Sequence, residues 1–118
     1  MGGAIAIEIA LARSELLAGI ALVGSGARLR VTPLIKDEVI RNYSHAAEVI
    51  AEWAYSPKTD SKLRRASVQE LLEVPAAVTY GDFEACDRFD KMNEIGRISL
   101  PTLIVCGEDD KLTPIKYS

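Results

Sequence analysis

The stretch Leu100-Pro-Thr-Leu-Ile-Val-Cys106 decides the fold of this sequence, and it leads directly into Gly107-Glu-Asp-Asp110 and Lys111-Leu-Thr-Pro114. A continuous apolar run of this length, ended by turn residues, is typical of a strand that is buried on both faces. A second run of the same kind, Leu17-Ala-Gly-Ile-Ala-Leu-Val23, ends at Gly24-Ser-Gly26. Strands buried on both faces belong to parallel sheets, so the sequence predicts two parallel-type core strands.

The segment Ala4-Ile-Ala-Ile-Glu-Ile-Ala-Leu-Ala12 precedes the first predicted strand and alternates large with small residues. Such alternation can signal a strand, but here it is Ile against Ala rather than apolar against polar, and Ala is the strongest helix former. A helix that is apolar nearly all round is typical of a fully buried helix. We therefore expect a buried helix over residues 3–13.

Amphipathic helical patterns fill the chain from Thr32 to about Ile95. Thr32 followed by Pro33 is typical of an N-cap and the first helical position. The predicted helices run from Pro33 to about Asn42, from Ser44 to Ser56-Pro57, from Asp60 or Ser61 through Leu72, and from Pro75 to about Tyr80, with Gly81-Asp82-Phe83 opening a further short helix.

The predicted fold class is therefore an α/β fragment that is predominantly helical overall. It has two parallel-type strands and one buried helix as parts of a core, and a mainly helical insertion between the strands. Two such strands cannot be covered on both faces by one helix and a helical layer. The sequence thus predicts that part of the core is missing.

Composition excludes several function classes. The 118 residues include 14 Lys and Arg against 17 Asp and Glu, a net charge of −3, with no basic cluster, so we expect neither nucleic acid nor a membrane surface as partner. The longest apolar run, Leu16 to Gly24, is too short to span a bilayer, and no signal segment is visible. Cys86 and Cys106 lack CxxC spacing, which disfavours zinc and disulfides and favours a reducing, cytoplasmic setting.

Three segments carry a family resemblance: Met1-Gly-Gly-Ala-Ile-Ala6, Leu22-Val-Gly-Ser-Gly-Ala27, and the run from Leu100 to Pro114. In this order they resemble the α/β-hydrolases, and within them the small bacterial lidded carboxylesterase or acyl-hydrolase branch. There, the corresponding segments are the stretch directly after the nucleophile, the next core strand with its loop into the lid, and the strand and loop that present the triad acid. The resemblance spans the whole chain.

The resemblance implies a division of the chain and two site residues. Residues 1–26 and 98–118 would be parts of the hydrolase core, and residues 27–97 would be a helical lid. Asp110, three residues after Gly107, would be the triad acid. The backbone amide of Met1, directly after the nucleophile, would belong to the oxyanion hole.

The resemblance places the remaining catalytic groups outside this sequence. The nucleophilic Ser would lie immediately before Met1, and the catalytic His would lie beyond Ser118. It thus implies a central fragment of a serine hydrolase whose parent acts on a small-molecule ester or related acyl substrate, with no cofactor and no metal. We expect the isolated chain to be catalytically inactive, so the sequence does not decide whether this chain is itself an enzyme. Ester, thioester, lactone, carbon–carbon bond and haloperoxidase chemistries stay open for the parent.

Other residues allow alternative interpretations of the site. His45, the one histidine, could act as a base for Ser44 or Ser25, but Ser44 better suits a helix start. The run Glu108-Asp-Asp110 could hold Mg²⁺ or Ca²⁺, whereas a turn at a strand end is the commoner explanation. Gly24-Ser-Gly26 resembles the start of a dinucleotide-binding turn, but Leu29 stands where the third glycine should be.

The cysteines and two aromatic residues have plainer interpretations. Cys106 is expected to be a buried, inert thiol, and Cys86 has acidic rather than electropositive neighbours. Trp53 and Tyr55 could line an acyl pocket, although helix packing is the more common role of such residues.

A second hypothesis comes from a different class of function: a non-catalytic helical module that self-associates. The strand over residues 17–23 would have an apolar edge with unpaired backbone groups, and such edges pair with another copy. We expect a homodimer or a higher oligomer that buries the first helix and both strands. A helical small-molecule binder is a third possibility that no motif supports.

Overall fold

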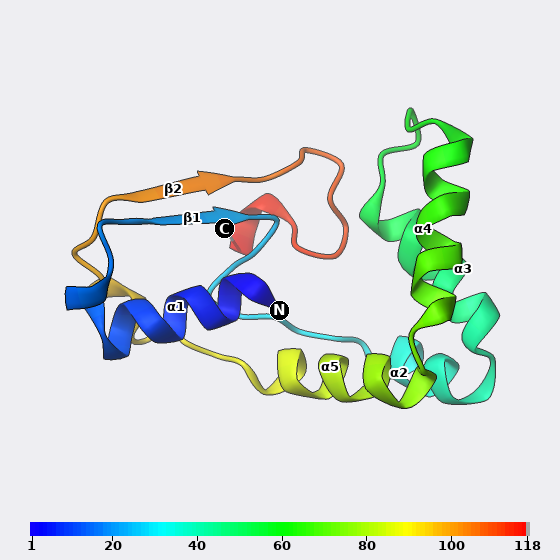
Figure 1. The fold of residues 1–118 in the computed structure, drawn as a ribbon, viewed down its shortest axis with the longest axis horizontal. Helices are drawn as coiled ribbons and strands as arrows, with labels where there is room; N and C mark the ends of the chain where they lie inside the picture. Colours follow the sequence, from blue (N-terminus) through cyan, green and yellow to red (C-terminus); the bar gives the residue numbers. More distant parts are fainter. Residues whose placement is uncertain (118) are drawn as a thin grey trace.

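The computed structural model describes residues 1–117 and has a predominantly helical α/β fold (Figure 1). Its elements, in chain order, are α1 (Gly2–Ala12), β1 (Ile20–Val23), α2 (Pro33–Arg41), α3 (Tyr43–Ala54), α4 (Ser61–Glu73), α5 (Ala76–Arg88) and β2 (Thr102–Val105). Short 3₁₀ turns cover Ser14–Leu16, Ile95–Arg97 and Ile115–Tyr117. The predicted fold class is confirmed.

β1 and β2 form a parallel two-stranded sheet. Ile20 pairs with Thr102 and Val23 with Val105, so the strands are in register from end to end. Both are shorter than predicted. At the start, Ile20 N donates to Pro101 O at 2.9 Å, while Pro101 has no N–H of its own to extend the ladder. At the far end Gly24 turns away with a φ of +52°, a conformation that glycine adopts without strain.

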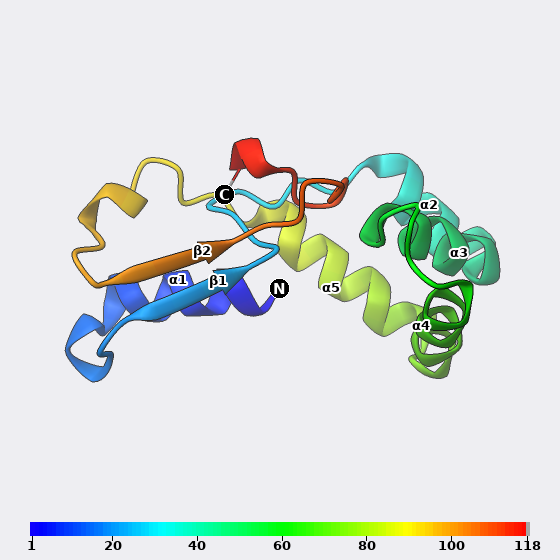
Figure 2. The ribbon, with the colours of Figure 1, turned by 90° about the horizontal axis from the view of Figure 1, so that it is seen from above.

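α1 lies along one face of the sheet (Figures 1 and 2). The predicted helix is confirmed, but its burial is one-sided: Ala4, Ile7 and Ala10 are buried, whereas Ile5 is 54% exposed. All four residues of β2 are exposed as well, against the prediction of a strand buried on both faces. The physical reason is that α1 packs chiefly on β1, so β2 and the far face of the described sheet have no covering element.

The four helices α2 to α5 form a separate group, here called the helical layer, beyond the carboxyl ends of the strands (Figure 1). Thr32 Oγ1 accepts a hydrogen bond from Ile35 N at 3.4 Å and caps α2, as predicted. The predicted cap of α3 at Ser44 is wrong. Asn42 caps α3 instead, because its side-chain oxygen accepts from His45 N at 3.3 Å, and Ser44 lies in the first turn.

α5 is one continuous helix, which corrects the prediction of one helix ending at Tyr80 and another beginning at Gly81. A glycine inside a helix costs about 1 kcal/mol relative to Ala, and its neighbours offset that cost. Thr79 is buried, with Oγ1 2.7 Å from the Tyr43 hydroxyl, and Phe83 packs against the core of the helical layer. Tertiary packing therefore overrides the local break signal.

The core of the helical layer is small and well defined. Ile35, Val39 and Ala46 are buried together between α2 and α3, and partly buried apolar side chains from α3 and α5 surround them. The Tyr43 hydroxyl donates to Leu71 O at 2.7 Å and so ties α3 to the end of α4.

Within residues 1–117, every helix is too short or too polar to traverse a lipid bilayer.

Two segments connect the helical layer to the sheet: the entry connector, residues 24–32, and the exit connector, residues 89–101. They run antiparallel beside each other, with Lys91 N donating to Ala27 O at 2.8 Å. An ion pair of 2.7 Å joins Arg28 to Asp90, and Lys91 Nζ lies 3.2 Å from Glu8 of α1. The chain therefore enters and leaves the helical layer at one place.

Val39 gives a test of this packing. Val39 has no exposed surface, so we expect Val39→Ala to lower the free energy of unfolding by about 2 kcal/mol through lost apolar burial and a residual cavity. Leu34→Ala on the same helix is the matched control, because Leu34 is 73% exposed, and a change within about 0.5 kcal/mol is expected there. Urea unfolding followed by circular dichroism measures both values. Equal destabilisation by the two changes would contradict the assigned core.

Candidate active site

A hollow of about 320 Å³ lies between the carboxyl ends of the strands and the helical layer. Met1, the turn after β1, the loop after β2, the entry connector and three helices all contribute to its lining. Most of its surface is apolar. In parallel α/β sheets, ligands bind beyond the carboxyl ends of the strands, so the hollow has the position expected of an active site.

Asp110 lies in the loop after β2 and lines this hollow. Its Oδ1 accepts hydrogen bonds from Leu112 N at 2.9 Å and from Thr113 N at 2.8 Å. Its Oδ2 accepts from the Thr113 hydroxyl at 2.8 Å. Three donors from its own loop thus hold the carboxylate in one orientation, which is what a residue needs if it is to orient another group.

Gly24 brings the end of β1 against this carboxylate. A Cβ at position 24 would lie 3.4 Å from Asp110 Oδ2 and 3.7 Å from Thr113 Oγ1. Because β1 and β2 are parallel neighbours, the turns that follow them meet at the same edge of the sheet. The pairing of the strands therefore places the loop of Asp110 beside the turn that leads into the helical layer.

Met1 lines the same hollow from the amino-terminal end of α1. Its carbonyl accepts from Ala4 N at 2.9 Å, so the helix begins directly after it. The first helical residue, Gly2, and its neighbour Gly3 leave α1 without side chains at this end, and a Cβ at Gly3 would collide with the Ser25 side chain. The two site residues implied by the family resemblance, Met1 and Asp110, thus lie on one hollow.

The helical layer supplies the apolar part of the lining. Ile35, Ile50, Trp53 and Phe83 all line the hollow. Trp53 also packs on the core of the helical layer, as expected of helix packing, whereas Tyr55 does not line the hollow. The loop of Asp110 is fastened to α3 through Lys111 N, which donates to Trp53 O at 3.3 Å.

His45 lies apart from the hollow. Its Nδ1 is 2.9 Å from Glu38 Oε1, its side chain is 57% exposed, and it is not among the residues that line the hollow. Ser25 lines the hollow, and Ser44 sits in the first turn of α3. The alternative in which His45 serves Ser25 as a base therefore has no support in the arrangement of these side chains.

The acidic run Glu108–Asp110 does not converge on one point. Asp109 accepts a hydrogen bond from Ser56 Oγ at 2.6 Å, while Asp110 is bonded within its own loop. In the part of the chain that the structure describes, no three His, Cys, Asp or Glu side chains are grouped to hold a metal ion. The turn at Gly24-Ser-Gly26 is the beginning of the entry connector and is not followed directly by a helix, unlike a dinucleotide-binding turn.

Both cysteines are half-buried. Cys106 was expected to be a buried thiol; it is partly exposed because it follows the exposed strand β2, and its Sγ donates to Thr113 O at 3.3 Å. Cys86 lies on α5 and lines the hollow.

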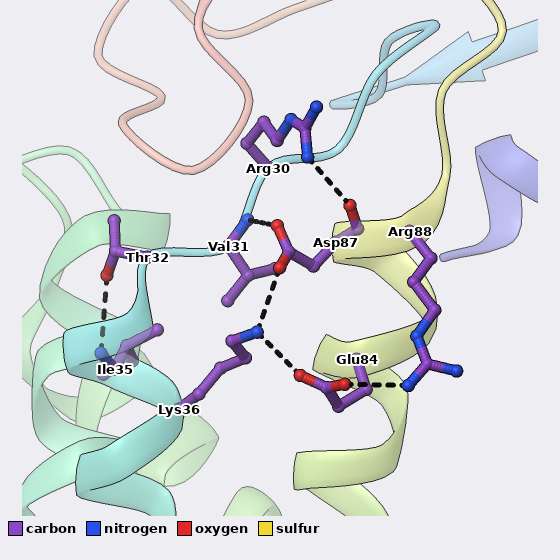
Figure 3. A network of polar contacts seen from close by, with 8 residues as sticks. All are labelled: Arg30, Val31, Thr32, Ile35, Lys36, Glu84, Asp87 and Arg88. Carbon is purple, nitrogen blue, oxygen red and sulfur yellow. Dashed lines mark hydrogen bonds and ion pairs between the residues drawn. The ribbon is translucent and has the colours of Figure 1, made fainter.

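A polar network behind the lining was not expected from the sequence (Figure 3). Lys36 Nζ of α2 lies 2.6 Å from Glu84 Oε1 and 2.9 Å from Asp87 Oδ2, both of α5. Two hydrogen bonds raise the pKa of Lys36 above its usual range: the one to Glu84 has the larger effect, and the one to Asp87 the smaller. The hydrogen bond from Lys36 in turn lowers the pKa of Glu84 and the pKa of Asp87.

Thr113 is the second feature that sequence reasoning missed. The spacing of Asp110 and Thr113, an Asp followed three residues later by a hydroxyl residue, matches the local turns in which an Asp side chain binds backbone N–H groups ahead of it. That spacing was the available signal. For the Lys36 network no signal existed, because its members come from helices that are far apart in the sequence.

Comparison with known proteins supports the fold described above. A solved structure of a thermophilic esterase superposes on 98% of this chain with a TM-score of 0.87 and 34% sequence identity, and the match covers 46% of that esterase. This chain therefore spans less than half the length of that protein. No protein-family model and no curated protein matches the chain. The fold is esterase-like.

The Lys36 network predicts a specific acid sensitivity. A carboxyl group whose pKa is lower in the folded than in the unfolded state stabilises the fold when the pH is above its unfolded-state pKa, near 4. This contribution to stability is lost as the pH falls through the folded-state pKa. Lys36, whose pKa is raised, stays charged throughout this range. As the pH is lowered from about 4, we therefore expect the urea concentration at the unfolding midpoint to decrease more steeply for the native chain than for the double variant Glu84→Gln, Asp87→Asn. Parallel curves for the two proteins would contradict the assigned pairing.

Proposed function

We propose that this chain is the central part of an α/β-hydrolase-type serine hydrolase that cleaves carboxylic esters or related acyl compounds. The observation that carries the proposal is that Met1 and Asp110 line one hollow at the carboxyl ends of two parallel strands. The esterase-like fold supports it. Residues 1–26 and 98–118 would then be parts of the hydrolase core, and residues 27–97 the lid.

In this proposal Asp110 orients the base of a catalytic triad. A serine directly before Met1 attacks the acyl carbon, and a histidine beyond Ser118 takes the serine proton and gives it to the leaving alcohol. Water then attacks the acyl carbon while the same histidine takes a proton from the water, the bond between the acyl carbon and the serine oxygen breaks, and the histidine returns the proton to that oxygen as the carboxylic acid leaves. The Met1 amide N–H stabilises the oxyanion in both steps.

We expect that the chain of 118 residues alone does not hydrolyse esters, whereas a chimera does. In the chimera, this chain replaces the matching segment of the thermophilic esterase. Asp110→Asn in the chimera is expected to lower kcat by about 10³- to 10⁴-fold, because the histidine loses the carboxylate that holds its tautomer. Hydrolysis of 4-nitrophenyl esters measures kcat.

Asp109→Asn is the matched control for this experiment. Asp109 is the preceding carboxylate of the same loop and is bonded to Ser56 rather than within the hollow, so its loss is expected to change kcat less than about fivefold. A chimera in which both variants lose kcat equally, or in which Asp110→Asn is fully active, would refute the role given to Asp110. Ester turnover by the 118-residue chain that a serine-directed inhibitor abolishes would contradict its predicted inactivity.

A second candidate function is self-association of this chain as a homodimer. The observation that favours it is the uncovered apolar surface of the sheet and of α1: Val23 is 70% exposed, Leu103 is 61% exposed and Ile5 is 54% exposed. Both outer edges of the described two-stranded sheet also lack a neighbouring strand. Exposed edges and apolar faces of this kind pair with a second copy.

Sedimentation velocity at micromolar concentration is expected to show a dimer. Leu103→Lys is expected to weaken the dimer at least about tenfold, since it places a charge on the surface that would be buried. Leu34→Lys, at an exposed position of α2 away from the sheet, is the control and is expected to leave the dimer intact. A monomeric, folded native chain at these concentrations would rule self-association out.

A further inference from the structure

The entry connector forms one side of the hollow, and the Asp87 carboxylate holds its main chain at Val31. Arg30 Nη1 also donates to the main-chain O of Asp87 at 3.4 Å, a bond that substitutions of the Asp87 side chain leave in place. Leu29, Arg30, Val31 and Thr32 all line the hollow. Val31 N donates to Asp87 Oδ1 of α5 at 3.1 Å, and this bond fixes the main chain at the centre of that lining segment (Figure 3). A backbone segment that borders a binding hollow stays rigid only if its polar groups are satisfied.

Asp87 is itself well anchored. Its Oδ2 lies 2.9 Å from Lys36 Nζ, and the two side chains are only 27% and 16% exposed. Lys36 also binds Glu84, one turn earlier on α5, so the α2–α5 contact does not depend on Asp87 alone. Asp87 thus links three elements: the entry connector, α2 and α5 (Figure 3).

The residues next to this network form the side of the hollow. Each network residue is directly preceded in the sequence by a residue that lines the hollow. These pairs are Ile35 before Lys36 on α2, and Phe83 before Glu84 and Cys86 before Asp87 on α5. Asp87 itself does not line it. Its effect on a bound molecule is therefore exerted through Val31, which lines the hollow together with Ile50 and Trp53 of α3.

We propose that Asp87 is a positioning residue that sets the width of the hollow, and so makes this site select linear over branched apolar groups. This inference rests on the proposed function, because it takes the hollow to be the place where the apolar part of the ester binds. One carboxylate oxygen holds Val31 while the other is held by Lys36, so these two contacts restrain the connector against moving outward to admit a wider group. Without the bond to Val31, the connector yields and the selectivity is lost.

Trp53 provides a binding measurement that needs no catalysis. It is the one tryptophan of the chain and lines the hollow. We would titrate the chain with two 4-nitrophenyl ethers of equal carbon number, the linear octyl and the branched 2-ethylhexyl ether. Both quench tryptophan fluorescence through the nitrophenyl group, and neither has an acyl carbon. The native chain is expected to bind the linear ether at least about tenfold more tightly.

Two substitutions separate the bond to Val31 from the charge of Asp87. Asp87→Ala removes both, and the ratio of the two affinities is expected to fall to about twofold or less. Asp87→Asn keeps a carbonyl oxygen that accepts from Val31 N, so it is expected to keep most of the native ratio. Asp82→Asn removes a charge from the same helix at a position without a place in this network, and is expected to keep the ratio unchanged.

Three results would overturn the proposal: an unchanged ratio in Asp87→Ala, an equal loss in Asp87→Asn and Asp87→Ala, or no quenching by either ether. Should Asp87→Ala fail to fold, hydrogen exchange at the Val31 amide decides instead. It is expected to be protected in the native chain and in Asp87→Asn, and rapid exchange in the native chain would refute the assigned bond. An inactive chimera would remove the proposed reaction without altering these binding ratios.

Discussion

The parallel pairing of β1 with β2 is the contact on which the remaining arrangement depends. The two strands are separated in the sequence by the whole helical layer, yet they are in register from Ile20 and Thr102 to Val23 and Val105. Because the strands are parallel and aligned, the turn after β1 and the loop after β2 come together at one edge. That edge is where Gly24 lies against Asp110, where the hollow opens, and where the helical layer is attached. A one-residue shift in register would move Asp110 away from Gly24 and turn its strand over.

The fold class was predictable because its signals are local. The apolar runs that became β1 and β2, the Ala-rich segment of α1 and the Thr32–Pro33 start of α2 each carry their own pattern. Two errors concern the ends of elements, where Pro101 limits the ladder and Asn42 rather than Ser44 caps α3. A third arises from neighbours far along the chain, because contacts of Thr79 and Phe83 carry α5 through Gly81. The expectation of strands buried on both faces concerned a complete core, and the described residues cover only one face of the sheet.

The candidate site likewise contains some residues that the sequence indicates and others that it does not. Asp110 and Met1 were named from a resemblance, and the structure places both on one hollow, although their catalytic roles rest on the proposal. Thr113 follows from a spacing that a local turn explains. The contacts of Asp87 and Lys36 could not be foreseen, because they join the entry connector, α2 and α5, and no periodicity within one segment encodes a contact between segments. Residues that shape a binding site from behind its lining are for this reason the least visible in a sequence.

The adjacent connectors have a consequence for how such a protein can vary. Lys91 N and Ala27 O close the base of the helical layer, and Arg28 and Asp90 brace the same point. The chain between these residues therefore begins and ends at neighbouring points, which one main-chain hydrogen bond joins. The helices there could therefore be lengthened, shortened or replaced, and the lining of the hollow changed with them, while the two strands and the loops at their carboxyl ends kept their geometry. The helical layer that lines the hollow and the sheet edge that carries Asp110 are covalently continuous but free to change at different rates.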